Sequence, residues 1–327
     1  MAKIPENELA RQVMKGDRGA GARLITLLEE GNESAREVMK SLYPHTGKSM
    51  IVGITGGTGT GKSTLIDLLI HDFRQSGKRV GVVVVDPSSP FSGGAFLGDR
   101  LRMQRHACDE GVFIRSMASR GYLGGLARTT AETIRVMEAM GADVVLLETI
   151  GSGQDEVEVI RVAQTCILVI APNMGDDIQA LKAGLMEIGH IYVINKSDLE
   201  GSIQALREVE AVLSMKTYPD KAWKPRVLST VATEGKGIRE LVSAIQEHNV
   251  FINQGARADR FRFERVEYEL SLVFKNELER LVHEGLKGTG KKKKYIRKIC
   301  DGQSDPYTII AEVLKNFLKK GSFDPEK

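Results

Sequence analysis

The stretch that decides the fold is MIVGITGGTGTGKST, residues 50–64, in which an apolar run leads into a glycine-rich loop. Its second half matches the pattern G-x-x-x-x-G-K-[ST], with Gly56, Gly61, Lys62 and Ser63 at the fixed positions. Glycines allow backbone N–H groups to turn toward phosphate oxygens, and the N-terminus of a following helix adds a favourable dipole. We therefore predict a phosphate-binding loop between a strand and a helix.

Each part of this loop has a predicted task. Lys62 would reach the β- and γ-phosphates of a nucleotide, and the Ser63 hydroxyl would ligate Mg²⁺. A glycine-rich turn without a ligand is the alternative, and the lysine and serine in their fixed places argue against it. The predicted nucleotide contacts cover the whole loop: Gly56, Gly57, Thr58, Gly59, Thr60, Gly61, Lys62, Ser63 and Thr64.

Apolar runs of similar length recur along the chain and alternate with helical stretches. Their Val, Ile and Leu content is typical of strands buried on both faces, and the alternation indicates parallel βα units. Six runs follow the first one: RVGVVVVD, GVFIRS, DVVLLET, CILVIAP, HIYVINK and RVLST. We predict an α/β fold of the P-loop NTPase type, with a mostly parallel central sheet flanked by N-terminal helices and a C-terminal helical extension.

The sequence divides into three predicted parts: a helical segment at 1–48, a nucleotide-binding domain at 49–250 and a helical arm at 251–327. In the arm, residues 257–286 contain no Pro or Gly until Gly285 and predict one long helix. The stretch GLKGTGKKKK predicts a mobile linker with solvated lysines, and DPYTIIAEVLKNFLKK a final amphipathic helix. An apolar stripe near a 3-4 repeat is either a helix–helix seam or a core-facing surface: Val266, Leu270, Val273, Leu278 and Leu281.

The tetrapeptide NKSD, Asn195–Asp198, follows another buried run and indicates which base is bound. Asp198 can accept hydrogen bonds from guanine N1–H and N2–H₂, while Asn195 meets the O6/N7 edge. Adenine would leave the carboxylate desolvated and unpaired, at a cost on the order of a few kcal/mol. With Lys196 between them, these residues predict GTP as the nucleotide. Ser229 and Thr230 either close over the base through backbone N–H groups or form a plain strand-end turn.

Carboxylates near the ends of two other runs indicate a metal site. Parallel sheets bind ligands at the carboxyl ends of their strands, so Asp86 and Glu148 can converge on Mg²⁺ and the γ-phosphate. Asp99, in GGAFLGDR, is a further candidate. A helix or turn cap is the alternative for Asp86, and a charge at a helix N-terminus is the alternative for Asp99. Most GTPases place a catalytic glutamine directly after a glycine, whereas here Gly151 is followed by Gln154 three residues later.

Bulk composition narrows the class of protein. With 327 residues, 42% hydrophobic and 27% charged, the chain is long enough for a substantial core and has ordinary globular composition. A net charge of +3 gives no reason to expect nucleic acid. No signal or transit peptide and no membrane span is predicted, so the expected location is the cytoplasm. The six histidines are scattered without ligand spacing, and three cysteines are interpreted as reduced thiols: Cys108, Cys166 and Cys300.

With these residues in view, the sequence strongly resembles the MeaB/ArgK family of P-loop GTPases, which accompany adenosylcobalamin-dependent acyl-CoA mutases. The resemblance spans nearly the whole chain, and the blocks DPSSPFSGG and SRGYLGGLA are more specific than the phosphate loop. It also includes GDRGAGARLITLLE, DRLRM, ETIGSGQDE, GDDIQALKAGLMEI, NKSD and DPYTIIAEVL. The family's loop usually reads G-V-P-G-A-G-K-S, and this chain has G-T-G-T at residues 57–60 in place of V-P-G-A, which leaves the loop less rigid.

The resemblance implies roles for further residues. It places Asp86, Asp99 and Glu148 as an acidic shell around Mg²⁺, which Ser63 also ligates. The segment GDDIQALKAG is similar to a mobile loop that relays the nucleotide state to the mutase, with Asp176, Gln179 and Lys182 as its contacts. The resemblance also implies a homodimer formed through C-terminal helices.

We therefore expect a GTP-hydrolysing chaperone of an adenosylcobalamin-dependent acyl-CoA mutase, methylmalonyl-CoA mutase being the commonest partner. It would gate cofactor loading and protect or reactivate the mutase. Lys62 and Glu148 would support hydrolysis, and Gln154, Lys182 or a partner residue would position the attacking water. Because no glutamine follows Gly151 directly, we expect slow intrinsic turnover that the partner accelerates. The alternatives are an ATP-dependent kinase linked to lysine, arginine and ornithine transport, which NKSD opposes, and a metal-insertion GTPase, which would need a Cys/His cluster.

Overall fold

The computed structural model of the chain describes residues 5–86, 104–106, 108–118, 125–149, 161–172, 185–219, 222–286 and 290–319. The chain forms two compact units, Met1–Glu267 and Tyr268–Lys327. The first contains the sheet and the helices around it, and the described residues of the second form helices and the turns between them. No helix in the described ranges combines the length and the apolar character that crossing a bilayer would require.

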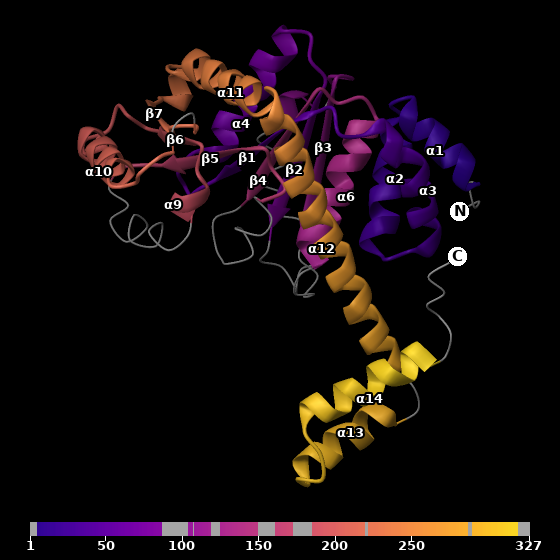
Figure 1. Cartoon of the computed structure of the whole chain (residues 1–327). Helices are drawn as coiled ribbons and strands as arrows, with labels where there is room; N and C mark the ends of the chain where they lie inside the picture. The colour runs from indigo at the N-terminus through magenta and orange to yellow at the C-terminus, as the bar shows by residue number, and fades with distance from the viewer. Residues whose placement is uncertain are drawn as a thin grey trace. The chain divides into compact units, whose positions relative to one another are not determined.

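Three helices precede the sheet and pack with a fourth that comes later in the chain (Figure 1). They are α1 (Glu6–Met14), α2 (Arg18–Glu29) and α3 (Glu33–Leu42), and their partner is α6 (Gly125–Ala139). Side chains at the helix starts cap them: Asp17 accepts from the amide of Ala20 at 2.7 Å, and Asn32 accepts from the amide of Ser34 at 2.9 Å. The predicted N-terminal helices are therefore present, with their apolar faces buried in one cluster.

In the described ranges the sheet has seven strands, all parallel, in the order β3-β2-β4-β1-β5-β6-β7. Each of the seven apolar runs forms one of them, which confirms the predicted fold class. Strand β1 lies between β4 and β5, so the segment before the phosphate loop occupies the middle of the sheet. The strands are β1 (Met50–Thr55), β2 (Val80–Asp86), β3 (Val112–Ala118), β4 (Val144–Thr149), β5 (Thr165–Ile170), β6 (Ile191–Ile194) and β7 (Arg226–Ser229).

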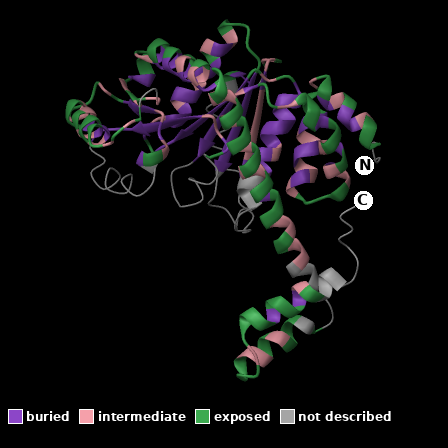
Figure 2. Cartoon of the chain, in the orientation of Figure 1, coloured by how far each residue is buried: buried purple, intermediate pink, exposed green. Residues whose placement is uncertain are grey.

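Helices cover both faces of this sheet, and Figure 2 shows its strands as the most buried part of the first unit. On one face α4 (Lys62–Gln75) and α11 (Ile238–Ile252) share a core with Ile167 and Val169 of β5. On the other face α10 (Ser202–Ser214) packs with the alternate residues Leu168 and Ile170. Short helical turns complete the unit: Tyr43–His45, Gln104–His106, α9 (Leu185–Ile188) and Ala232–Glu234.

Helix α12 (Ala256–Leu286) is continuous from the first unit into the second, as the absence of Pro and Gly predicts. The prediction of a linker is wrong for the four lysines, because residues 291–294 form the first turn of α13 (Lys291–Cys300). Gly290 is the N-cap residue of this helix, and glycine adopts its left-handed φ of 74° without strain. Lysine is a good helix former where its charge stays in solvent. The next helix is α14 (Pro306–Lys319). Asp305 precedes it and caps its start, because its side chain accepts a hydrogen bond from the amide of Thr308 at 2.9 Å.

Four members of the predicted apolar stripe on α12 are solvent-exposed in the single chain. Leu270 is 67% exposed, and Phe274 beside the stripe is 68% exposed. An apolar helix face of this kind is left for another surface to cover. The other exposed members are Val266, Val273 and Leu278.

Candidate nucleotide-binding site

The glycine-rich loop joins β1 to α4, and at two of its glycines a neighbouring group leaves no room for a side chain. A Cβ on Gly56 would lie 2.1 Å from the carbonyl oxygen of Val169, and φ of Gly56 is 141°. A Cβ on Gly61 would lie 2.3 Å from Nδ2 of Asn195, and φ of Gly61 is 93°. Both positions therefore require glycine for space and for conformation.

Lys62 lies inside the loop. Its side chain is buried, and Nζ donates to the carbonyl oxygens of Gly56 at 2.7 Å and Gly57 at 2.9 Å. The hydroxyl of Thr60 donates to the same Gly57 carbonyl at 2.9 Å, which ties the loop together. The predicted phosphate-binding lysine is therefore held at the centre of the loop, next to the N-terminus of α4.

Two of the predicted metal ligands meet in a buried hydrogen bond. The Ser63 hydroxyl donates to Oε1 of Glu148 at 2.7 Å, although the two residues are 85 positions apart. The cause is sheet topology: β4 pairs with β1, and Glu148 is in register with Ile54 near the end of β1. Strand β2 pairs with β4 as far as Val85 and Thr149, and Asp86 is the next and last residue of β2. Its backbone therefore reaches the same edge of the sheet.

Asn195 connects the phosphate loop to the loops that follow β6 and β7. Its Nδ2 donates to the carbonyl of Thr60 at 2.8 Å. Its Oδ1 accepts from the Thr230 hydroxyl at 3.0 Å and from the amide of Ala232 at 3.1 Å. The side chain is buried and all of these bonds stay within the protein, so Asn195 fixes the position of three loops in this structure. Its predicted contact with guanine stays a prediction.

The remaining residues of the NKSD motif project from the sheet edge. Lys196 has φ of 57°, a left-handed conformation that is uncommon outside glycine, and Asp198 is exposed. The amide of Ser197 donates to the carbonyl of Thr230 at 3.0 Å, and the amide of Thr230 donates to Ile194 at 2.9 Å. The N–H of Thr230 is therefore bonded to the carbonyl at the end of strand β6 instead of being offered to a base, whereas Ser229 is exposed at the end of β7.

One residue near this edge escaped the sequence reasoning. Lys236 lies close enough to Asp198 for that carboxylate to help raise its pKa, after the larger effect of its hydrogen bond with Glu234. Val231 and Lys236 form a β-bridge, so the segment after β7 turns back tightly on itself. The tripeptide GKG at 235–237 was the available signal, since two glycines beside a lysine after the last strand mark a loop at the ligand-binding edge.

Several predicted site residues lie outside the described ranges: Asp99, Gln154, Asp176, Gln179 and Lys182. Their roles stay predictions, as does the side-chain role of Asp86. Within the described ranges no group of three or more His, Cys, Asp or Glu side chains could hold a metal ion. The part of the metal site that the structure describes is therefore the pair formed by Ser63 and Glu148.

Comparison with known proteins identifies the family. The family model described as methylmalonyl Co-A mutase-associated GTPase MeaB matches residues 21–287. This chain belongs to the MeaB family. A protein of Pyrococcus abyssi whose name assigns no role beyond GTPase is 46% identical over 317 residues, covering 96% of this chain and 98% of that protein. The GTPase ArgK of Escherichia coli is 35% identical over 262 residues, covering 78% of this chain and 79% of ArgK.

Two further similarities extend the comparison. The mitochondrial methylmalonic aciduria type A homolog of Mus musculus is 33% identical over 285 residues, covering 82% of this chain and 69% of that protein. The crystal structure of a LAO/AO transport system kinase superposes with a TM-score of 0.70 and 25% identity, covering 97% of this chain and all of that one. This MeaB-family chain is accordingly a GTPase of P-loop fold that binds guanine nucleotides.

Proposed function

We propose that this MeaB-family GTPase regulates an adenosylcobalamin-dependent acyl-CoA mutase. Its nucleotide state would gate cofactor loading and protect or reactivate the mutase, of which methylmalonyl-CoA mutase is the expected example. The observation that carries this proposal is the match of residues 21–287 to a family defined by its association with that mutase. The mouse relative, named for methylmalonic aciduria, supports the same assignment.

The geometry of the loops supports selection of GTP. Asn195 anchors the phosphate loop through Thr60 and the loop after β7 through Ala232, so Asp198 projects from a fixed frame. We infer that the Asp198 carboxylate accepts from the guanine Watson–Crick edge, with Lys196 and Ser229 beside the base. ATP would be disfavoured because adenine leaves that carboxylate without donors.

The chain's own residues fit a magnesium ion. Ser63 and Glu148 present a hydroxyl and a carboxylate oxygen 2.7 Å apart and buried, and hard oxygen ligands of these types are the ones that Mg²⁺ prefers. Asp86 and Asp99 would complete the acidic shell. When bound, Mg²⁺ would neutralise charge on the β- and γ-phosphates. Lys62 would bind the same phosphates from the loop.

We further propose that hydrolysis is slow in the isolated protein and is accelerated by the mutase. Either Gln154, Lys182 or a partner residue would position the attacking water, because no glutamine directly follows Gly151. Phosphoryl transfer depends on positioning and charge stabilisation, so a partner that orders the remaining loops can raise the rate. The exposed apolar stripe on α12 would form a homodimer interface. We propose the cytoplasm as the location, and neither nucleic acid nor a membrane as a partner.

The test is GTP hydrolysis by the full chain with and without its candidate mutase. We expect a nucleotide-dependent complex and a higher rate of phosphate release when the mutase is present. Asp198→Asn should reduce the preference for GTP over ATP, while Asp72→Asn, on the α4 surface, should leave it unchanged. An unchanged rate together with no nucleotide-dependent complex would exclude the regulatory proposal, and tighter binding of ATP than of GTP would favour the kinase alternative.

A further inference from the structure

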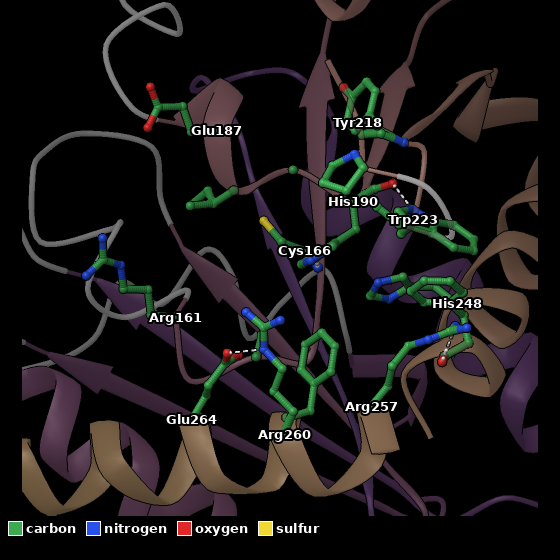
Figure 3. A pocket seen from close by; sticks show the side chains of 18 residues that line it. Arg161, Cys166, Glu187, His190, Tyr218, Trp223, His248, Arg257, Arg260 and Glu264 are labelled. Carbon is green, nitrogen blue, oxygen red and sulfur yellow. Dashed lines mark hydrogen bonds and ion pairs between the residues drawn. The ribbon is translucent and has the colours of Figure 1, made fainter. Parts of the chain in front are cut away.

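A second hollow lies at the edge of the sheet opposite the phosphate loop. Its volume is about 740 Å³, and it is formed entirely by residues of the first compact unit. Cys166 of β5, the segments that precede β6 and β7, the end of α11 and the start of α12 line it (Figure 3). Cavities of roughly 300–1,000 Å³ are typical of small-molecule sites. No residue of the nucleotide site takes part in it.

One wall of the hollow is a cluster of aromatic rings. The His190 and His248 ring centroids are 4.3 Å apart, and Trp223 meets His248 edge-on at 4.7 Å. The indole N–H of Trp223 donates to the carbonyl of His190 at 2.9 Å, which fixes the ring. Burial lowers the pKa of His190 to about 4 and that of His248 to about 3, so both imidazoles are neutral at physiological pH. An uncharged aromatic wall of this kind suits a planar ring.

Two buried polar atoms face this hollow without a partner in the described part of the chain. His248 is fully buried, and its Nδ1 is hydrogen-bonded to the Thr165 hydroxyl at 2.8 Å, but its Nε2 has no partner there. The Tyr218 hydroxyl is likewise buried and unpaired. Both residues line the hollow. Because unpaired buried polar groups are costly, atoms of this kind point to a ligand that satisfies them.

Arginines also line the hollow (Figure 3). Arg260 is paired with Glu264 at 2.7 Å. Arg257 lies over the Phe251 ring at 4.1 Å and donates one N–H to the Phe251 carbonyl at 3.3 Å, but it has no carboxylate partner among the described residues. Arg161 is exposed, and no hydrogen bond or ion pair to it occurs within the same ranges. Figure 3 shows Arg161 across the hollow from the ring cluster, whereas Arg257 is next to the cluster, because the Phe251 ring beneath it also lies 5.4 Å from Trp223. The donors of Arg257 that do not bond to Phe251 can bind an anion, since a planar fork of donors matches a carboxylate or a phosphate.

We propose that this hollow binds a small organic anion made of a planar ring and an acidic group. The ring stacks against Trp223 and His248, and the acidic group, a carboxylate or a phosphate, is bound by Arg257. The site is additional to the guanine nucleotide site, from which strands β5, β6 and β7 separate it. The two sites are therefore occupied independently.

Intrinsic fluorescence gives a direct test, because Trp223 is the one tryptophan of the chain. The full chain, saturated with GDP, is titrated with phenyl phosphate, phenylacetate, benzyl alcohol and inorganic phosphate. We expect a saturable change in tryptophan emission with the two aromatic anions. Benzyl alcohol and inorganic phosphate, each carrying half of the recognised chemistry, should bind at least about tenfold more weakly. The tighter of the two aromatic anions identifies the acidic group.

A pair of arginine variants separates a specific site from general adsorption. Arg257→Gln should weaken binding of the aromatic anion about tenfold, and Arg207→Gln, an exposed arginine of α10 outside the hollow, should not change it. Unchanged GDP affinity in both variants shows that they are folded. Four results would overturn the proposal: no saturable signal with any probe, equal binding of benzyl alcohol, displacement of phenyl phosphate by GDP, or equal effects of the two arginine variants.

Discussion

The substitution Asn195→Ala tests the central geometric feature of the nucleotide site. It removes one donor and one acceptor that serve the Thr60 carbonyl, the Ala232 amide and the Thr230 hydroxyl. The hydroxyl can rotate toward another partner, but the two backbone groups belong to buried residues and lose theirs. Each unsatisfied buried group costs about 1–3 kcal/mol, so the free energy of unfolding should fall by about 2–6 kcal/mol. That is a large share of the 5–15 kcal/mol, roughly, that is typical of a folded domain.

The assay is urea unfolding of the GDP-free protein, combined with the affinity for a fluorescent GDP analogue. The affinity should fall at least about tenfold, because the phosphate loop and the base loop are no longer held together. Asn7→Ala, an exposed position in the first turn of α1, is the matched control and should change stability by less than about 0.5 kcal/mol. If Asn195→Ala proves too unstable to purify, Thr230→Val removes only the hydroxyl bond and should cost about 1 kcal/mol. A loss below about 1 kcal/mol in Asn195→Ala, with unchanged GDP affinity, would refute the reasoning.

Three further predictions follow from the same structure. Glu148→Gln keeps the side-chain volume but removes the negative charge next to Ser63, so phosphate release from GTP should fall at least about tenfold across a magnesium titration. Gly56→Ala should abolish nucleotide binding or folding because its Cβ meets the Val169 carbonyl, whereas Gly59→Ala, which has the same sign of φ and open space, should cost only about 1–2 kcal/mol in unfolding experiments. Burial depresses the pKa of His248 from 6.5 to about 3. The neutral imidazole therefore contributes stability that is fully present above pH 6.5. This stability is lost as the pH falls from 6.5 toward 3, at up to about 1.4 kcal/mol per pH unit, because the unfolded chain binds a proton that the folded chain does not.

Each of these has a result that would contradict it. A normal rate in Glu148→Gln would mean that the acid is not part of the metal site. Equal stability of Gly56→Ala and Gly59→Ala would mean that the loop does not approach β5 as closely as the structure shows. For the histidine, urea unfolding at several pH values should give a shallower acid slope in His248→Gln than in the parent, and His45→Gln, an exposed control, should leave the slope unchanged. Identical slopes in all three proteins would rule out the burial effect.

The predictions from sequence succeeded where the signal is local. The seven apolar runs became seven strands because period, length and β-branched content are properties of short segments. The lysine stretch at 291–294 was misjudged for the same kind of reason. Its composition suggested a linker, but composition does not report that Gly290, with its left-handed φ, begins a helix at Lys291. Composition is weaker evidence than a cap combined with a helical pattern.

The amino-acid sequence by itself determined the glycine-rich loop, the alternation of strands and helices, the NKSD tetrapeptide and the membership in the MeaB family. Only the tertiary structure decided that Asn195 bonds to Thr60, 135 residues away, and that the Ser63 hydroxyl donates to Glu148. The same is true of the ring cluster beside Arg257, whose members come from separate segments of the chain. The physical reason is that a local pattern fixes the type of an element, whereas the order of strands in the sheet, set by packing across the whole core, decides which side chains meet.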